Sequence, residues 1–155
     1  MPTPSSTVIY ATPGQVFAAE DRALAKSRGA LWLTDTRIAR LVAETIRDGE
    51  HVMHFYESQA WVVMPNHVHL LILPRVSLPQ ITRWIKGRTA REANRLLGRT
   101  GQPFWEPESY DHWVRSEKEL HQIEHYIEQN PVAAGLAIAP EDWLWSSATN
   151  RNRTS

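Results

Sequence analysis

The sequence contains no cysteine. Disulfide bonds, thiolate metal ligands and a cysteine nucleophile are therefore excluded. It also has no apolar run of about 18 residues, the length that a membrane-spanning helix needs. Residues 1–6 carry neither the basic region nor the apolar core of an export signal. These absences lead us to expect a cytoplasmic protein.

The chain also has no excess of charge of either sign. It holds 17 Lys and Arg against 17 Asp and Glu, so its formal net charge is zero. A nucleic-acid partner would therefore be held by a local basic patch and not by the overall charge. The length of 155 residues suits one domain with a substantial core. We expect a disordered tail at residues 1–6, a single domain at residues 7–150 and a second tail at residues 151–155.

An apolar stretch at residues 60–74 is interrupted once, by Pro65 and Asn66. Pro pre-sets φ and Asn tolerates turn conformations, so this pattern predicts a β-hairpin. Side chains alternate between the two faces of a strand, so His67 and His69 in the second arm share one face. Histidines in apolar strands are often ordinary core or surface residues. Because a polar pair is costly in such a strand, the pattern favours a metal site.

The rest of the chain alternates between strand and helix patterns. Apolar residues at helical spacing predict a helix at residues 36–48 that ends at Gly49, and another at residues 78–97 that ends at Gly98. The other expected elements are a strand at 7–11, a helix at 15–28, a loop at 101–109, a strand at 110–115 and a helix at 117–129, ended by Asn130 and Pro131. This order predicts an α+β fold: a ferredoxin-like split βαβ antiparallel sheet, its first and third strands central, with helices on one face and an added C-terminal helix.

The helix at residues 78–97 has a basic face. Residues 75–99 hold seven Lys and Arg against one acid, Glu92, a net charge of +6. Most charge runs on helices are solvated faces, but a phosphate backbone would bind at this one. Three tryptophans, Trp84, Trp105 and Trp113, accompany the run, and aromatic platforms beside a basic groove suit single-stranded bases.

The last helix carries a second group of candidate residues. Tyr126 and Asn130 are four residues apart and share one helix face, with Gln129 on the adjacent row. A tyrosine in such a position is more often a packing residue than a nucleophile. His121 and His125 are also four apart, but the glutamate that follows the first histidine of a zinc-protease helix is missing. We interpret these two histidines as surface residues.

Three motifs in this order resemble those of the REP-associated tyrosine transposases, which belong to the insertion sequence 200-like single-tyrosine transposases with a His-hydrophobic-His motif. The motifs are MPNHVHLL at residues 64–71, SYDHWVR at residues 109–115 and YIEQNPVAAGL at residues 126–136. The resemblance extends over residues 32–147.

The resemblance implies a metal-dependent single-stranded DNA endonuclease and strand transferase. His67 and His69 would bind Mg²⁺ or Mn²⁺, Asn130 or Gln129 would be the third ligand, and Tyr126, on the C-terminal helix, would attack DNA to form a 5′-phosphotyrosine. The substrate would be single-stranded DNA next to a hairpin of the repetitive extragenic palindrome (REP) type. The residues expected to bind DNA are Arg83, Lys86, Arg88, Arg91, Arg95, Trp105 and Arg115.

Two alternatives remain at this point. Relatives open with a longer first strand than residues 7–11, and a stunted strand would leave ladder groups of its neighbour unpaired. This favours a catalytically decayed protein that still binds DNA hairpins. An RNA-binding module of similar topology would stack bases on aromatic residues in its central strands, where this chain has His67 and His69. The sequence leaves open whether the protein is a monomer or a dimer.

Overall fold

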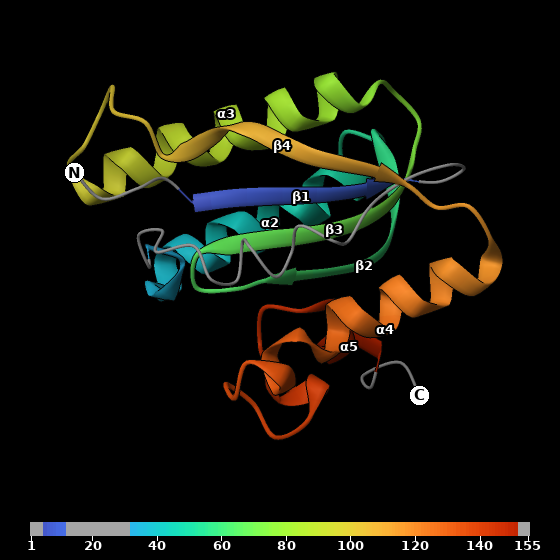
Figure 1. Ribbon diagram of the computed structural model, residues 1–155. Coiled ribbons are helices and arrows are strands. Elements are labelled where there is room, and N and C mark those ends of the chain that lie inside the picture. The colour runs from blue at the N-terminus through green and yellow to red at the C-terminus, as the bar shows by residue number, and fades with distance from the viewer. Residues whose placement is uncertain (1–4, 12–31, 152–155) are drawn as a thin grey trace.

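The computed structural model describes residues 5–11 and 32–151. Within them, four strands form one sheet in the order β2-β3-β1-β4 (Figure 1). The elements in chain order are β1 (Ser5–Ala11), the 3₁₀ turn η1 (Trp32–Thr34), α2 (Thr36–His51), β2 (Tyr56–Val63), β3 (His67–Pro74), α3 (Leu78–Leu97), β4 (Trp105–Trp113), α4 (Glu117–Ala133), the 3₁₀ turn η2 (Pro140–Asp142) and α5 (Ser147–Arg151). The predicted helix at residues 15–28 lies outside the described residues. None of the helices in the described ranges is long and apolar enough to cross a membrane.

The predicted hairpin is present as β2 and β3. The two strands are antiparallel, with Val63 opposite Val68 and Trp61 opposite Leu70. Between them, the backbone N–H of Met64 donates to the carbonyl of His67 at 2.8 Å, which closes the turn. Strand β3 lies between β2 and β1, so the histidine strand is central, as the sequence predicts.

The prediction of a wholly antiparallel sheet is wrong for the first strand. Strand β1 runs parallel to β3, from Ser6 opposite His67 to Tyr10 opposite Leu71, and parallel to β4 as well. A short alternating stretch carries no information about strand direction, and the long connection from Ala11 to β2 permits either one. The strand nevertheless flanks β3 along most of its length.

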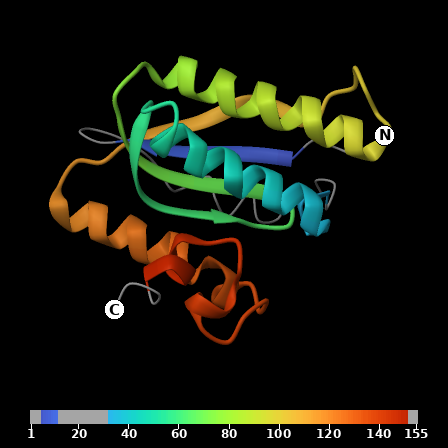
Figure 2. The ribbon, with the colours of Figure 1, turned by 180° about the vertical axis from the view of Figure 1, so that it is seen from behind.

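The two faces of the sheet have different neighbours. Helices α2 and α3 cover one face, and α4 lies beside the β2 edge (Figures 1 and 2). The guanidinium of Arg47 on α2 lies 5.1 Å from the ring centre of Trp61, so Trp61 and its cross-strand partner Leu70 face these helices. Because side chains alternate along β3, His67 and His69 face the opposite way.

Helix α2 begins where the sequence predicts and ends later. Asp35 is the N-cap, and its side chain accepts from the backbone N–H of Arg37. Gly49 does not end the helix, which continues to His51. A β-carbon on Gly49 would lie 2.2 Å from the hydroxyl of Tyr56, so glycine is needed here for close packing and not as a cap.

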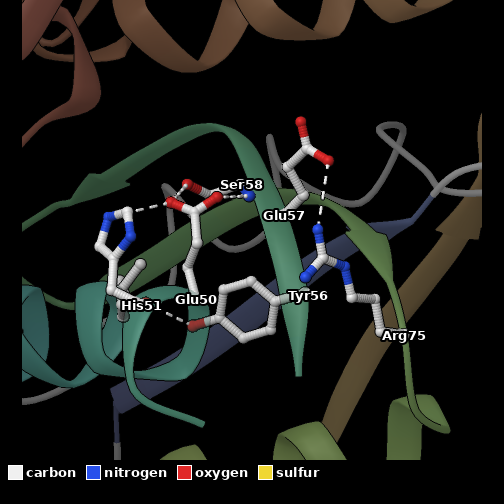
Figure 3. Close-up of polar contacts among 7 residues, drawn as sticks. Glu50, His51, Tyr56, Glu57, Ser58 and Arg75 are labelled. Carbon is white, nitrogen blue, oxygen red and sulfur yellow. Dashed lines mark hydrogen bonds and ion pairs between the residues drawn. The ribbon is translucent and has the colours of Figure 1, made fainter. Parts of the chain in front are cut away.

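The start of β2 is fastened to α2 by polar contacts (Figure 3). The hydroxyl of Tyr56 donates to the carbonyl of Ile46 at 2.6 Å, and burial raises the pKa of Tyr56. The carboxylate of Glu50 accepts from the backbone N–H of Ser58 at 2.6 Å and from its hydroxyl at 3.0 Å. The backbone N–H of Ser58, a donor on the edge strand, thereby has a hydrogen-bond partner.

The second half of the chain confirms one predicted helix and corrects two boundaries. Helix α3 covers the predicted residues, and Gly98 follows it with a left-handed φ of 68°. Strand β4 begins at Trp105, in the stretch predicted as a loop. Helix α4 continues through Asn130 and Pro131 to Ala133, because a proline in the last turn loses one backbone hydrogen bond while its side chain is buried.

Candidate active site

The two histidines of β3 form a buried pair. The side chains of His67 and His69 are 3% and 1% exposed, and their ring centres are 4.8 Å apart at an interplanar angle of 85°. Burial lowers the pKa of His67 to about 4. The pKa of His69 is also lowered well below its usual value, by burial first and then by the neighbouring His67. Both rings are therefore neutral at neutral pH and have a nitrogen lone pair to offer to a cation.

Asn66, at the end of the hairpin turn, orients the first ring. Its amide oxygen lies 2.7 Å from Nδ1 of His67. An amide oxygen can only accept, so Nδ1 carries the proton and the lone pair of His67 is on Nε2. Sequence reasoning used Asn66 only as a turn residue and missed this contact. A polar residue next to a histidine in an apolar stretch is the signal that could have revealed it.

Helix α4 brings Tyr126 and Asn130 to the same histidine. The ring of Tyr126 is centred 6.0 Å from the ring of His69, at an angle of 80°. The side-chain nitrogen of Asn130 lies 3.5 Å from Nε2 of His69. Tyr126 is 40% exposed, so part of its side chain is accessible from solvent. The four residues that the sequence singles out for catalysis and metal binding thus lie together.

The donor set suits a divalent cation. In the described part of the chain no three His, Cys, Asp or Glu side chains form a cluster. The amide of Asn130, whose nitrogen lies 3.5 Å from Nε2 of His69, could serve as a third ligand beside the histidines. Asn130 faces the pair, whereas Gln129 is turned about 100° around the helix axis. A half-turn of the Asn130 amide exchanges its nitrogen and oxygen and points the oxygen at the site. Two imidazoles and an amide oxygen suit Mn²⁺ somewhat better than Mg²⁺.

The basic residues of α3 lie on the other side of the sheet from the histidine pair, because α3 covers the face to which Leu70 and not His69 points. Some of their charge is already paired. Arg88 forms a 2.6 Å ion pair with Asp48 of α2, and Arg95 is bonded to Glu92.

A shallow groove on α3 contains the unpaired part of this charge. Its volume is about 260 Å³, and it is lined by Arg83, Trp84, Gly87, Arg88 and Arg91. Within the described part of the chain, Arg83 and Arg91 are exposed and form no ion pair. Two arginines therefore offer free positive charge at this groove.

The other residues expected to bind DNA differ in accessibility. Trp105 is 7% exposed, and its indole N–H donates to the hydroxyl of Thr89 at 2.7 Å. Its ring therefore has no open face on which a base could stack. Lys86 is half-buried and takes part in other contacts, whereas Arg115 is exposed just before α4.

Comparisons with known proteins agree with the motifs. Residues 24–130 match the family model described as Transposase IS200 like. A REP-associated tyrosine transposase of Escherichia coli (strain K12) is 29% identical over 93 residues, which are 59% of this chain and 54% of that protein. A putative REP-associated tyrosine transposase of Haemophilus influenzae (strain ATCC 51907 / DSM 11121 / KW20 / Rd) is 29% identical over 104 residues, which are 59% of this chain and 58% of that protein. The chain thus spans a little over half the length of these curated relatives.

A solved structure of a REP-associated tyrosine transposase bound to a REP hairpin has a similar fold. The TM-score is 0.60 and the sequence identity 25%, over 81% of this chain and 72% of the other. The resemblance inferred from the motifs is therefore confirmed. Because the family model covers more than half of the sequence, including all four residues of the site, the chain belongs to the IS200-like transposase family.

Proposed function

We propose that this protein is a metal-dependent single-stranded DNA endonuclease and strand transferase that acts next to DNA hairpins. The observation that carries the proposal is the convergence of Tyr126 and Asn130 on the buried pair His67 and His69. The relatives named as REP-associated tyrosine transposases, one of them bound to a REP hairpin, support a hairpin substrate.

The reaction is a transesterification. The hydroxyl oxygen of Tyr126 attacks the scissile phosphorus, a new bond forms between phosphorus and the tyrosine oxygen, and the bond to the 3′ oxygen breaks. The departing 3′ oxygen takes up a proton to become a 3′-hydroxyl, and the tyrosine proton passes to solvent. The product is a 5′-phosphotyrosine, and attack on it by another 3′-hydroxyl rejoins a strand. Each step exchanges one phosphate ester for another, so no nucleotide cofactor is required.

The other site residues prepare this step. His67 and His69 are neutral, so they can hold a Mg²⁺ or Mn²⁺ ion, with the amide oxygen of Asn130 as third ligand. A divalent cation there would offset phosphate charge and stabilise the leaving oxygen. Asn66 keeps the lone pair of His67 on Nε2. Tyr126 is partly exposed, so a flexible single strand can approach this residue.

The α3 groove is the proposed contact for the hairpin. Arg83 and Arg91 flank Trp84, and their charge suits phosphates. Arg88 and Arg95 contribute less, because acidic side chains already neutralise them. A substrate that uses both surfaces would pass around an edge of the sheet, with the hairpin on the α3 side and the scissile strand on the histidine side.

The decayed, binding-only alternative rested on a first strand too short to support the histidine strand. Strand β1 pairs with β3 from His67 to Leu71, so the backbone beside both histidines has a neighbour. This pairing supports the active enzyme, and the binding-only alternative is an outcome of the test.

The test is a denaturing gel of the protein with hairpin oligonucleotides labelled at the 5′ or the 3′ end, in Mn²⁺ or in EDTA. We expect a Mn²⁺-dependent shifted band that carries only the label on the 3′ side of the nick. Tyr126→Phe and His69→Gln should lack the band, whereas His121→Gln, which alters an exposed histidine of α4, should retain it. Hairpin binding without this band in the unaltered protein would establish the binding-only function instead.

A further inference from the structure

We propose that Glu128 and Ser147 form a latch that fixes the rotation of α4 and thereby holds Tyr126 and Asn130 over His69. Both latch residues are positioning residues, and the inference rests on the proposed function of that site. The match to the family model ends at Asn130, and Ser147 lies in the segment that follows it.

The hydroxyl of Ser147 is the centre of the latch. It accepts the backbone N–H of Trp61 in β2 at 2.9 Å, and it lies 2.7 Å from the carboxylate of Glu128 in α4. The carbonyl of Trp61 is 3.2 Å away. A hydroxyl has one proton, and the charged carboxylate is the stronger acceptor. Ser147 therefore joins α4 to the sheet through one charge-assisted and one neutral hydrogen bond.

The segment that carries Ser147 is itself fixed to the β2 edge. The backbone N–H of Val63 donates to the carbonyl of Trp145 at 2.9 Å, and the indole N–H of Trp143 donates to the carbonyl of Val63 at 3.0 Å. The neighbouring strand residue, Val62, pairs with His69 across the hairpin. Ser147 is thus a fixed point close to the strand that holds the histidines.

The direction of the latch explains what it controls. Successive helix residues are about 100° apart, so Glu128, two residues from both Tyr126 and Asn130, projects from the opposite side of α4. The buried residues of the helix form one narrow row of Ile123, Ile127 and Pro131. A helix that packs through a single apolar row can rotate about that row. The hydrogen bond between Glu128 and Ser147, on the side of α4 away from Tyr126, opposes this rotation. The latch therefore sets the angle at which the nucleophile and the amide meet His69.

Such control matters because productive geometry is narrow. Catalytic groups have to be held within ~0.5 Å and ~10–20° of their working positions. Tyr126 is 40% exposed, so its position depends in part on the orientation of α4. Loss of the latch would misplace the attacking oxygen and the third metal ligand together, while the α3 groove on the other side of the sheet would be unaffected.

The test compares Ser147→Ala with Ser147→Thr, which keeps a hydroxyl, and with Glu128→Gln, which keeps an acceptor. The matched control is Ser58→Ala, because the hydroxyl of Ser58, also in β2, bonds a glutamate of α2, Glu50, and not one of α4. The readouts are the single-turnover rate of the covalent DNA adduct, the Kd for the hairpin and hydrogen exchange of the α4 amides. We expect Ser147→Ala to lower the adduct rate ~10- to 100-fold and to speed α4 exchange, with the Kd unchanged.

Ser147→Thr and Glu128→Gln should retain most of the rate, and Ser58→Ala should match the unaltered protein. The latch is rejected if Ser147→Ala lowers only the Tm and leaves both the adduct rate and α4 exchange unchanged, or if Ser147→Thr is as slow as Ser147→Ala. If the unaltered protein forms no adduct at all, the proposed function fails, and hydrogen exchange of α4 still decides whether the latch exists.

Discussion

Asn66 illustrates how a single side chain can decide the chemistry of this site. His67 has two ring nitrogens, and the hydrogen bond to Asn66 at 2.7 Å leaves the lone pair on Nε2, the nitrogen that we propose binds a cation. Partners of this kind fix the tautomer and ring orientation of metal-binding histidines, and their mutation typically costs ~10- to 100-fold in metal affinity.

Replacement of Asn66 by Ala should therefore weaken Mn²⁺ binding by ~10- to 100-fold with little change in fold. Asn66→Asp keeps an oxygen that accepts from Nδ1 and should retain most of the affinity. Isothermal titration of the purified proteins with Mn²⁺ would measure the effect. Equal affinities for Asn66→Ala and the unaltered protein would mean that the turn alone orients His67.

Burial of His67 should make the metal-free protein sensitive to acid. Its folded-state pKa of about 4 lies below the usual value of 6.5, so below pH 6.5 the unfolded chain binds a proton that the folded chain does not. Titration of His67 should lower the free energy of unfolding by ~3 kcal/mol as the pH drops from 6.5 towards 4. Above pH 6.5 His67 should make no pH-dependent contribution to this free energy. The free energy of unfolding, measured with urea, should change less steeply with pH for His67→Asn than for the unaltered protein over this range. Parallel plots of this free energy against pH would show that His67 does not cause the acid sensitivity.

At the scale of elements, two helical glycines have opposite roles. Gly49 in α2 lies against the ring of Tyr56, whereas a β-carbon on Gly87 in α3 would meet nothing within 4 Å. Overpacking costs ~1–3 kcal/mol, and replacing a helical glycine by alanine otherwise gains ~1 kcal/mol. Gly49→Ala should therefore lower the Tm and Gly87→Ala should raise it. Thermal unfolding of both variants measures these two changes in Tm. A higher Tm for Gly49→Ala would show that Tyr56 moves aside at little cost.

The α3 groove provides a second prediction at this scale. Replacing Arg83 and Arg91 together by Gln should weaken hairpin binding for all sequences alike and flatten the plot of log K against log salt by ~2 slope units, if both contact phosphates. Arg95→Gln should do less, because Glu92 already neutralises Arg95. Fluorescence anisotropy at several salt concentrations measures the slopes. A change in sequence preference at constant slope would instead assign base contacts to this surface.

Periodicity in the sequence predicts elements better than their ends or directions. The hairpin, α3 and its Gly98 cap follow from turn chemistry and helical spacing, which are local. The continuation of α2 past Gly49 depends on Tyr56, and Pro131 lies inside α4 because its ring is buried there. The parallel direction of β1 depends on pairing with β3. Contacts between distant segments decided each of these, so a local pattern could not reveal them.

In the candidate site, too, local sequence patterns predict some features, whereas other features depend on tertiary packing. Alternation along β3 and spacing along α4 predict which residues share a face, and the structure brings both faces together at His69. Neither pattern predicts that Trp105 is buried or that Asp48 neutralises Arg88, because these depend on how α2, α3 and β4 pack. The latch at Ser147 joins residues 86 positions apart in the chain and has no local signal.

At the scale of the whole molecule, the sheet separates two surfaces. The histidine pair and α4 lie on one side, and the basic groove of α3 lies on the other. Binding and chemistry should therefore respond to different substitutions, with changes in the groove altering affinity and changes at Tyr126 altering only the covalent step. On the chemical side, we propose that Tyr126 is the residue that becomes joined to DNA.

The most direct measurement of that claim is the identification of the modified residue by tandem mass spectrometry. The adduct formed with hairpin DNA in Mn²⁺ would be digested with nuclease and trypsin, and cleavage after Lys118 and Arg151 releases a peptide in which Tyr126 is the single tyrosine. We expect a nucleotide linked through a 5′ phosphate to this peptide, with the other three tyrosines unmodified. A nucleotide on any other residue, or no adduct from protein that binds the hairpin, would contradict it.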